Sequence, residues 1–165
     1  TYNEIQNKDT CLKGTTYTGH LFLDNQEDVD NFNYTRVNGD LTIYSWGKIK
    51  NINGLKTLTS VSGYVNIGNN TALSSLSGLD NLTSVGKDFS VYFNDALTNL
   101  NGLNSITSVG ENLKVYENKA LTNLCGIRQL ITNGQISSDE YVVNENAYNP
   151  SYEEIQNIGS TGCEE

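Results

Sequence analysis

Hydrolysis is the first chemistry to consider, because a histidine and several carboxylates are the groups that act as acid and base in many hydrolases. The single histidine is His20, and Asp24 and Asp40 are the carboxylates expected near it. Nucleophilic catalysis also needs a serine or cysteine held by that base, and no serine is identifiable as its partner. We therefore expect no catalytic triad.

Asp40 and Asp88 are the one pair of carboxylates whose spacing suggests a glycosidase. The repeat described below places them two strands apart on one face, roughly 9.6 Å, against about 6.5–9.5 Å in inverting enzymes. General acid catalysis needs one carboxyl group with a raised pKa, and an open strand face supplies no cause for it. The sequence predicts no enzyme and no cofactor, and no loop has the density of oxygen ligands that would predict a metal site.

The charge balance narrows the choice of partners. The chain carries 10 Lys+Arg against 19 Asp+Glu, a net charge of −9. Binding to nucleic acid or to an anionic membrane surface needs clustered positive charge. No apolar run approaches the roughly 20 residues of a membrane-spanning helix. We expect neither nucleic-acid binding nor membrane insertion.

The elements that position the side chains follow from an internal repeat. The repeat is 24 residues long, the distance in sequence from Gly54 to Gly78. Three sets of positions recur in register at this step: Gly-Leu or Gly-Ile pairs starting at 54, 78, 102 and 126; Val61, Val85 and Val109; and apolar pairs at 41/43, 65/67, 89/91 and 113/115. Each apolar pair, with its period of two, is a short strand. The other apolar residues step by three, which favours extended segments and tight corners over a long helix.

A repeat of this length predicts a parallel β-solenoid. About 20 residues separate successive strands, so the economical fold is a coil that stacks each strand in parallel beside the last, about 4.8 Å away, with a right-handed crossover. Stacked coils share one core that a single unit cannot bury alone. Leu21/Leu23 and Tyr141/Val143 extend the strand pattern at the two ends, and we expect about five to six coils.

Short capping helices are expected at both ends, because terminal repeats of solenoids are commonly irregular. Residues 25–32 begin with an Asn that suits a helix cap. Residues 149–157 offer Asn149 as a cap, Pro150 at the first helical position and acidic residues in the first turn.

An asparagine column accompanies the strands. Asn70, Asn94 and Asn118 each follow the second apolar residue of a strand by three positions, and Asn146 does the same. An inward asparagine stacked on its neighbours can satisfy the backbone groups of a corner, so a structural ladder is favoured over a ligand site. Trp46 stands at this position in its coil. We expect Trp46 to pack against the front helix, and the alternative is an exposed anchor for a ligand.

Alternation along the strands predicts one exposed strip of side chains. Its candidate binding residues are Tyr44, Trp46, Tyr64, Asn66, Asp88, Tyr92, Lys114 and Tyr116. Tyrosine supplies a large amphipathic contact area at modest entropic cost. The strip suits a sugar stacked on a ring or a protein partner with a basic patch. The alternative is that tyrosine merely has a high β-propensity and pairs across strands.

Two segments resemble a known family. Residues 83–91 (TSVGKDFSV) and 107–115 (TSVGENLKV) resemble units of the leucine-rich-repeat, receptor-L-domain-like surface proteins that are common in Bacteroidetes, and residues 19–23 and 37–43 resemble that family's opening. The likeness runs from about residue 15 to 163. It implies a right-handed single-stranded β-helix, non-catalytic extracellular recognition, and a protein that is secreted or attached to the outer membrane at the cell surface.

Three cysteines bear on the domain organisation. We favour a disulfide between Cys125 and Cys163 that pins the terminal helix in an oxidising compartment; two unpaired thiols are the alternative. Residues 2–7 (YNEIQN) share five of six residues with residues 152–157 (YEEIQN), and a cysteine, Cys11, follows them too. We interpret residues 1–11 as the closing helix of a preceding, similar domain or as an N-terminal cap, and residues 12–165 as one solenoid domain.

These features together predict an extracellular recognition or adhesion module. It binds a protein or polysaccharide through the strand face, is one unit of a tandem array, and has neighbouring copies of the same domain as further partners. A carbohydrate-binding module of a polysaccharide-utilising system is the alternative. An ice-binding solenoid is a minor alternative, based on two hydroxyl columns: Thr35, Thr59, Thr83 and Thr107, and Ser74, Thr98 and Thr122.

Overall fold

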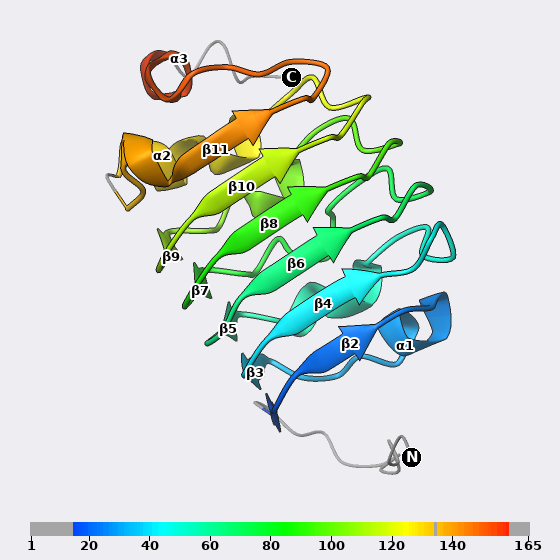
Figure 1. Cartoon of the computed structure of the whole chain (residues 1–165). Helices are drawn as coiled ribbons and strands as arrows, with labels where there is room; N and C mark the ends of the chain where they lie inside the picture. The colour runs from blue at the N-terminus through cyan, green and yellow to red at the C-terminus, as the bar shows by residue number, and fades with distance from the viewer. Residues whose placement is uncertain (1–14, 134, 159–165) are drawn as a thin grey trace.

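Two parallel β-sheets form the framework of the computed structural model, which describes residues 15–133 and 135–158 (Figure 1). The six-stranded sheet has the order β11-β10-β8-β6-β4-β2, and the five-stranded sheet has the order β1-β3-β5-β7-β9. The strands of the first sheet are β2 (Leu21–Leu23), β4 (Leu41–Tyr44), β6 (Val65–Gly68), β8 (Phe89–Tyr92), β10 (Leu113–Tyr116) and β11 (Tyr141–Asn144). Those of the second are β1 (Thr16–Thr18), β3 (Arg36–Asn38), β5 (Ser60–Val61), β7 (Ser84–Val85) and β9 (Ser108–Val109).

The repeat length is the length of one coil. In the six-stranded sheet, Val65 pairs with Phe89 and Phe89 pairs with Leu113, each one repeat further along the chain. The same register continues to Leu41 on one side and to Tyr141 on the other. The predicted parallel stacking of the strands is therefore confirmed.

The five-stranded sheet is a correction to the single strand per coil that the apolar pattern of the repeat indicated. Its strands β5, β7 and β9 are only two residues long, and they contain the valine column Val61, Val85 and Val109. Each of these valines is buried. A two-residue strand is too short to show alternation, so the sequence marked the column as apolar without identifying it as a strand.

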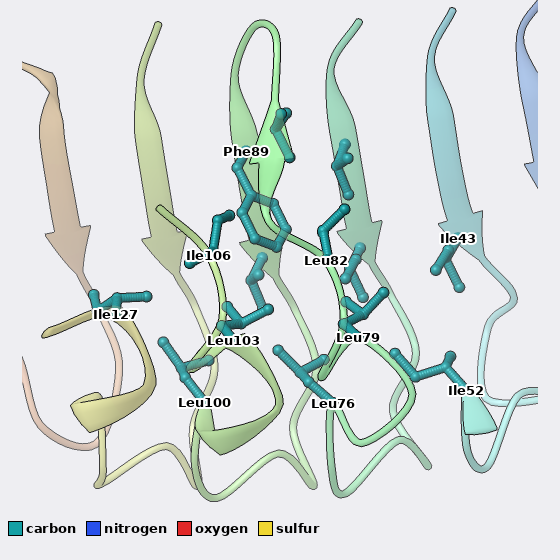
Figure 2. Packing of buried hydrophobic residues seen from close by; sticks show 14 of the residues in the cluster. Ile43, Ile52, Leu76, Leu79, Leu82, Phe89, Leu100, Leu103, Ile106 and Ile127 are labelled. Atoms are coloured by element: carbon teal, nitrogen blue, oxygen red, sulfur yellow. The ribbon is translucent and has the colours of Figure 1, made fainter. Parts of the chain in front are cut away.

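The core lies between the two sheets and the corners that join them, as Figure 2 shows. Leucines and isoleucines that step by three along the chain line up from coil to coil, with Leu76 beside Leu100 and Leu79 beside Leu103, all fully buried. The corners include the 3₁₀ helices η1 (Asn53–Thr57), η2 (Asn101–Leu103) and η3 (Cys125–Ile127). Because 3₁₀ helices have three residues per turn, they keep a three-residue apolar step on one side.

Glycine allows successive coils to approach at these corners. A Cβ on Gly102 would overlap the carbonyl oxygen of Leu76, and a Cβ on Gly126 would overlap that of Leu100. The Gly-Leu column of the repeat thus marks the points where one coil rests on the backbone of the coil before it.

Short α-helices lie toward both ends of the solenoid (Figure 1). Helix α1 (Gln26–Asp30) begins where predicted, with the Asn25 side chain accepting a bond from the Asp28 amide at 3.0 Å. Helix α2 (Arg128–Thr132) follows η3, and η4 (Ser138–Glu140) precedes β11.

Helix α3 (Tyr152–Asn157) corrects the predicted start at Asn149 and Pro150. Its N-cap is Ser151, which forms a capping box with Glu154. Asn149 instead accepts a bond from the Asn146 amide at 2.8 Å. The cap was misplaced because Asn149 and Ser151 are both good capping residues, and only Ser151 has a glutamate three positions later.

The proposed disulfide and the proposed domain boundary involve residues outside the described part of the chain. Cys11, Cys163 and residues 1–14 all lie there, whereas Cys125 lies at the start of η3. The Cys125–Cys163 pairing, the division at residue 12 and the tandem array stay predictions.

Candidate functional site

A row of tyrosines runs across the six-stranded sheet at the carboxyl ends of its strands. The row consists of Tyr44, Tyr92 and Tyr116, all half-buried. The rings of Tyr92 and Tyr116 stack with centroids 5.2 Å apart and planes only 5° from parallel. Burial and the nearby phenols of Tyr116 and Tyr44 raise the pKa of Tyr92. Tyr92 and Tyr116 therefore form one stacked surface, and Tyr44 lies close enough to act on the Tyr92 phenol electrostatically.

Gly68 makes room for this tyrosine row. It occupies the same position in β6 that Tyr44 and Tyr92 occupy in the flanking strands. A Cβ on Gly68 would overlap the ring of Tyr92, so that ring lies directly over the glycine. The missing side chain in β6 is what allows Tyr92 to lean toward Tyr44.

The asparagine ladder fixes the corner just past these strands. Asn70, Asn94 and Asn118 are fully buried, and each donates to a carbonyl one coil back: those of Ile43, Ile67 and Val91. The Asn70 amide in turn donates to the Asn94 side chain at 3.2 Å, and the Asn94 amide donates to that of Asn118 at 3.1 Å. The predicted structural ladder is confirmed, and Asn146 extends it.

Trp46 does not lie where the sequence placed it. It is 72 % exposed, so the expected packing against the front helix is wrong. Ser45 takes the ladder position instead: it is buried and donates to the Asn70 side chain at 2.8 Å. An indole is too large for the buried corner. The backbone after Ser45 is left-handed at both Trp46 (φ 52°) and Gly47 (φ +86°), and the Trp46 side chain lies outside the core. Trp46 packs edge-on against Tyr44, with ring centroids 5.5 Å apart.

A second row of side chains lies beside the tyrosines, and we call it the corner ridge. Its members follow the ends of β4, β6, β8, β10 and β11, and all have left-handed backbone with φ between 52° and 55°: Trp46, Asn69, Phe93, Glu117 and Glu145. Phe93 is 38 % exposed and packs against Tyr92 and Tyr116, with centroids 6.0 and 6.1 Å away. The alternation of the strands stops at their ends and so does not predict Phe93, Glu117 or Glu145. The position directly before each ladder asparagine is the signal that identifies them.

The acidic end of the corner ridge contains two neighbouring carboxylates. Tyr116 pairs with Asn144, so Glu117 and Glu145 follow adjacent strands. A hydrogen bond with Glu145, together with partial desolvation and the charge of Glu145, raises the pKa of Glu117. Lys119 and Asp95 also act on Glu117, and they lie 3.4 Å from each other.

Asp88 is held as an anion. Partial burial acts to raise its pKa, but hydrogen bonds from Lys114 and Asn112 outweigh it and lower the pKa to about 2. The Asp88 carboxylate accepts from the Asn112 amide at 2.9 Å and forms an ion pair with Lys114. Asp88 is therefore a poor proton donor at neutral pH, and the Lys114 ammonium is paired with its carboxylate.

The remaining predicted residues lie at or before the amino ends of the strands or within them, short of the carboxyl ends that carry the tyrosine row. His20 contacts Thr42 at 2.9 Å and packs edge-on against Tyr64 at 5.7 Å. Asp40 accepts from the Tyr64 amide at 3.1 Å. Asn66 is half-buried in the middle of β6. The structure thus separates Tyr64 and Asn66 from the tyrosine row.

The threonine column forms hydrogen bonds between successive coils. Thr59, Thr83 and Thr107 each donate their hydroxyl to the carbonyl of the threonine one coil back, at 2.9, 3.0 and 3.2 Å. These hydroxyl groups bond successive coils to each other, at positions where Thr83 and Thr107 are themselves exposed.

Within residues 15–133 and 135–158, no helix is long and apolar enough to cross a membrane. In the same part of the chain, no group of three or more His, Cys, Asp or Glu side chains is arranged to hold a metal ion.

Comparison with known families identifies the fold. The family model described as Receptor L domain matches residues 33–125, more than half of the chain. The chain belongs to the receptor L domain family. A comparison with curated proteins found no match. The matched region contains β4, β6, β8 and β10 and therefore the whole tyrosine row.

Receptor L domains have a β-helix-like solenoid fold, in agreement with the two parallel sheets. They are ligand-binding, non-enzymatic modules of the extracellular type. Membership of this family supports a recognition role for this receptor L domain.

Proposed function

We propose that this receptor L domain recognises an extracellular partner through the tyrosine row and the corner ridge beside it, as one unit of a tandem array in a protein secreted from or attached to the surface of a bacterium. The observation that supports it most is two groups of aromatic rings in contact at the same end of the six-stranded sheet, Tyr44 with Trp46 and Tyr92 with Phe93 and Tyr116. Aromatic side chains dominate the energetics of recognition surfaces.

The structure favours the carboxyl end of the sheet over the middle of the predicted strip. Asp88 and Lys114 neutralise each other, and Ser90 between them is buried. Trp46 and Phe93, in contrast, are exposed, and the half-buried rings of Tyr92 and Tyr116 pack against Phe93 and against each other. We therefore expect Tyr92 and Tyr116 to contribute more to binding than Asp88, Asn66 or Tyr64.

The test is a screen of arrayed extracellular proteins and arrayed glycans with the purified domain. Partners found with wild type are then measured with Tyr92→Ala and Tyr116→Ala, and we expect each variant to weaken binding at least about 10-fold, the scale of one hot-spot side chain. Phe22→Ala is the matched control, since Phe22 is an aromatic residue of β2 that is 44 % exposed and lies outside the row. Equal loss with the control, or no loss with the tyrosine variants, would show that another surface binds.

Carbohydrate binding is the second candidate, and the exposed indole of Trp46 is the observation that favours it. A flat aromatic ring can stack on a sugar face, while Asn69 nearby offers an amide. Saturable binding to a defined oligosaccharide, lost in Trp46→Ala, would favour this candidate over a protein partner.

A further inference from the structure

Backbone strain at two exposed aromatic residues indicates that they serve something other than packing. Trp46 and Phe93 both have φ of 52°, a left-handed conformation that costs roughly 1–2 kcal/mol for a residue with a side chain and is unusual for bulky ones. Asn69, with φ 55°, shows the residue type that tolerates this backbone best. Strained positions of this kind cluster at functional sites.

The charge of the corner ridge indicates what kind of partner it fits. Glu117 and Glu145 directly follow Tyr116 and Asn144, which pair on adjacent coils, and the two carboxyl groups act on each other. Asp95 lies near them, and Lys119 is the cation that faces this group, 3.4 Å from Asp95. Three carboxylates against one ammonium leave a negative charge beside the rings of Phe93 and Tyr116. A cation from outside would relieve the repulsion between the two glutamates.

We propose that the corner ridge binds an extended protein segment that carries an arginine or lysine, with the cationic group seated between Glu117, Glu145 and the rings of Phe93 and Tyr116. This inference rests on the proposed function and names its partner class. Arginine fits best, because its planar guanidinium bonds carboxylates in pairs and stacks on aromatic faces. Neutral sugars gain nothing from facing carboxylates, and acidic polysaccharides are repelled by them.

The dimensions of the ridge set the length of the segment. From Trp46 to Glu145 the ridge crosses four coil-to-coil steps, roughly 19 Å at about 4.8 Å each. An extended peptide rises about 3.3 Å per residue, so about six residues span the ridge. The segment is expected to have its basic residue at one end and an apolar residue over Trp46 at the other.

The test begins with selection of a random 12-residue peptide library on the immobilised domain. We expect enrichment of peptides in which an apolar residue and an arginine or lysine lie about five positions apart. The best peptide is then synthesised with arginine and with citrulline, which has the same shape without the charge. Citrulline is expected to weaken binding at least 10-fold to the wild type and little to a Glu117→Gln/Glu145→Gln variant.

A Glu111→Gln/Glu153→Gln variant is the matched control, because it removes the same charge from two exposed glutamates away from the ridge. Full binding by this control variant is expected. Enrichment of peptides without basic residues, no enrichment at all, or equal binding of the citrulline peptide would overturn the inference.

Phe93→Asn and Tyr116→Ala separate this inference from the proposed function. If binding depends on these rings but not on the peptide's charge, the recognition surface stands and the basic partner is wrong. If a glycan binds with the same dependence on the rings while no peptide is selected, the partner is a carbohydrate. If binding is indifferent to both variants, the proposed function fails as well.

Discussion

Replacing Asn94 with alanine is expected to lower the free energy of unfolding by about 3–5 kcal/mol. The side chain of Asn94 is fully buried and donates to the carbonyls of Ile67 and Tyr92, both at 3.0 Å, while accepting from the Asn70 amide. Alanine leaves the Ile67 carbonyl and the Asn70 amide without those bonds in a dry interior, at about 1–3 kcal/mol each, and adds a cavity.

Equilibrium unfolding in urea, followed by far-ultraviolet circular dichroism, measures this loss. Asn104→Ala is the control, because Asn104 is exposed and its replacement is expected to change stability by no more than about 0.5 kcal/mol. A loss below about 1 kcal/mol for Asn94→Ala would mean that the ladder is not what holds the corners, and that the corner ridge is positioned by something else.

Gly102→Ala is expected to destabilise the domain by more than about 3 kcal/mol or to prevent cooperative folding. In an ordinary loop this change would stabilise by about 0.4–1 kcal/mol, because it restricts the unfolded chain. Here the added Cβ overlaps the carbonyl oxygen of Leu76 and lies near the Ser77 nitrogen, both in the backbone of the preceding coil. Backbone cannot rotate away as a side chain can, so the two coils must separate and lose core contacts on both sides.

Thermal unfolding checks this prediction, with Gly19→Ala as a control. Gly19 has φ +116°, but its nearest neighbour is a Tyr17 side-chain atom 3.9 Å away, so the control reports backbone strain without steric overlap. We expect Gly102→Ala to lower the melting temperature by much more than Gly19→Ala. Equal effects would contradict the close approach of the coils at this corner.

The stacking of the coils was predictable because the repeat length can be read directly from the spacing of similar residues in the sequence. Val65, Phe89 and Leu113 are spaced by one repeat and pair in that register. The ladder was predictable for the same reason, since Asn70, Asn94 and Asn118 repeat with it. The second sheet was missed because strands such as Ser84–Val85 are too short for any pattern of alternation.

The site was only partly predictable. Tyr92 and Tyr116 follow from alternation within their strands, but their stacking depends on Gly68, whose role appears only when β6 lies beside β8. The three-residue spacing from the strand assigned Trp46 to the ladder position. That assignment fails because Ser45 occupies the position and bonds to Asn70. Phe93 has left-handed backbone, which no local pattern of apolar residues predicts.

The most direct test of the claim that the corner ridge serves recognition is the free energy of unfolding of Trp46→Asn and Phe93→Asn. Asparagine relieves the left-handed strain, roughly 1–2 kcal/mol, and removes edge contacts of about 0.5–1.5 kcal/mol each. We predict that Trp46→Asn is as stable as wild type or more stable by up to about 1 kcal/mol, and that Phe93→Asn stays within about 1 kcal/mol of it. A loss of about 2 kcal/mol or more in both variants, the scale of a buried core side chain, would show that these rings hold the fold together, and would contradict the account.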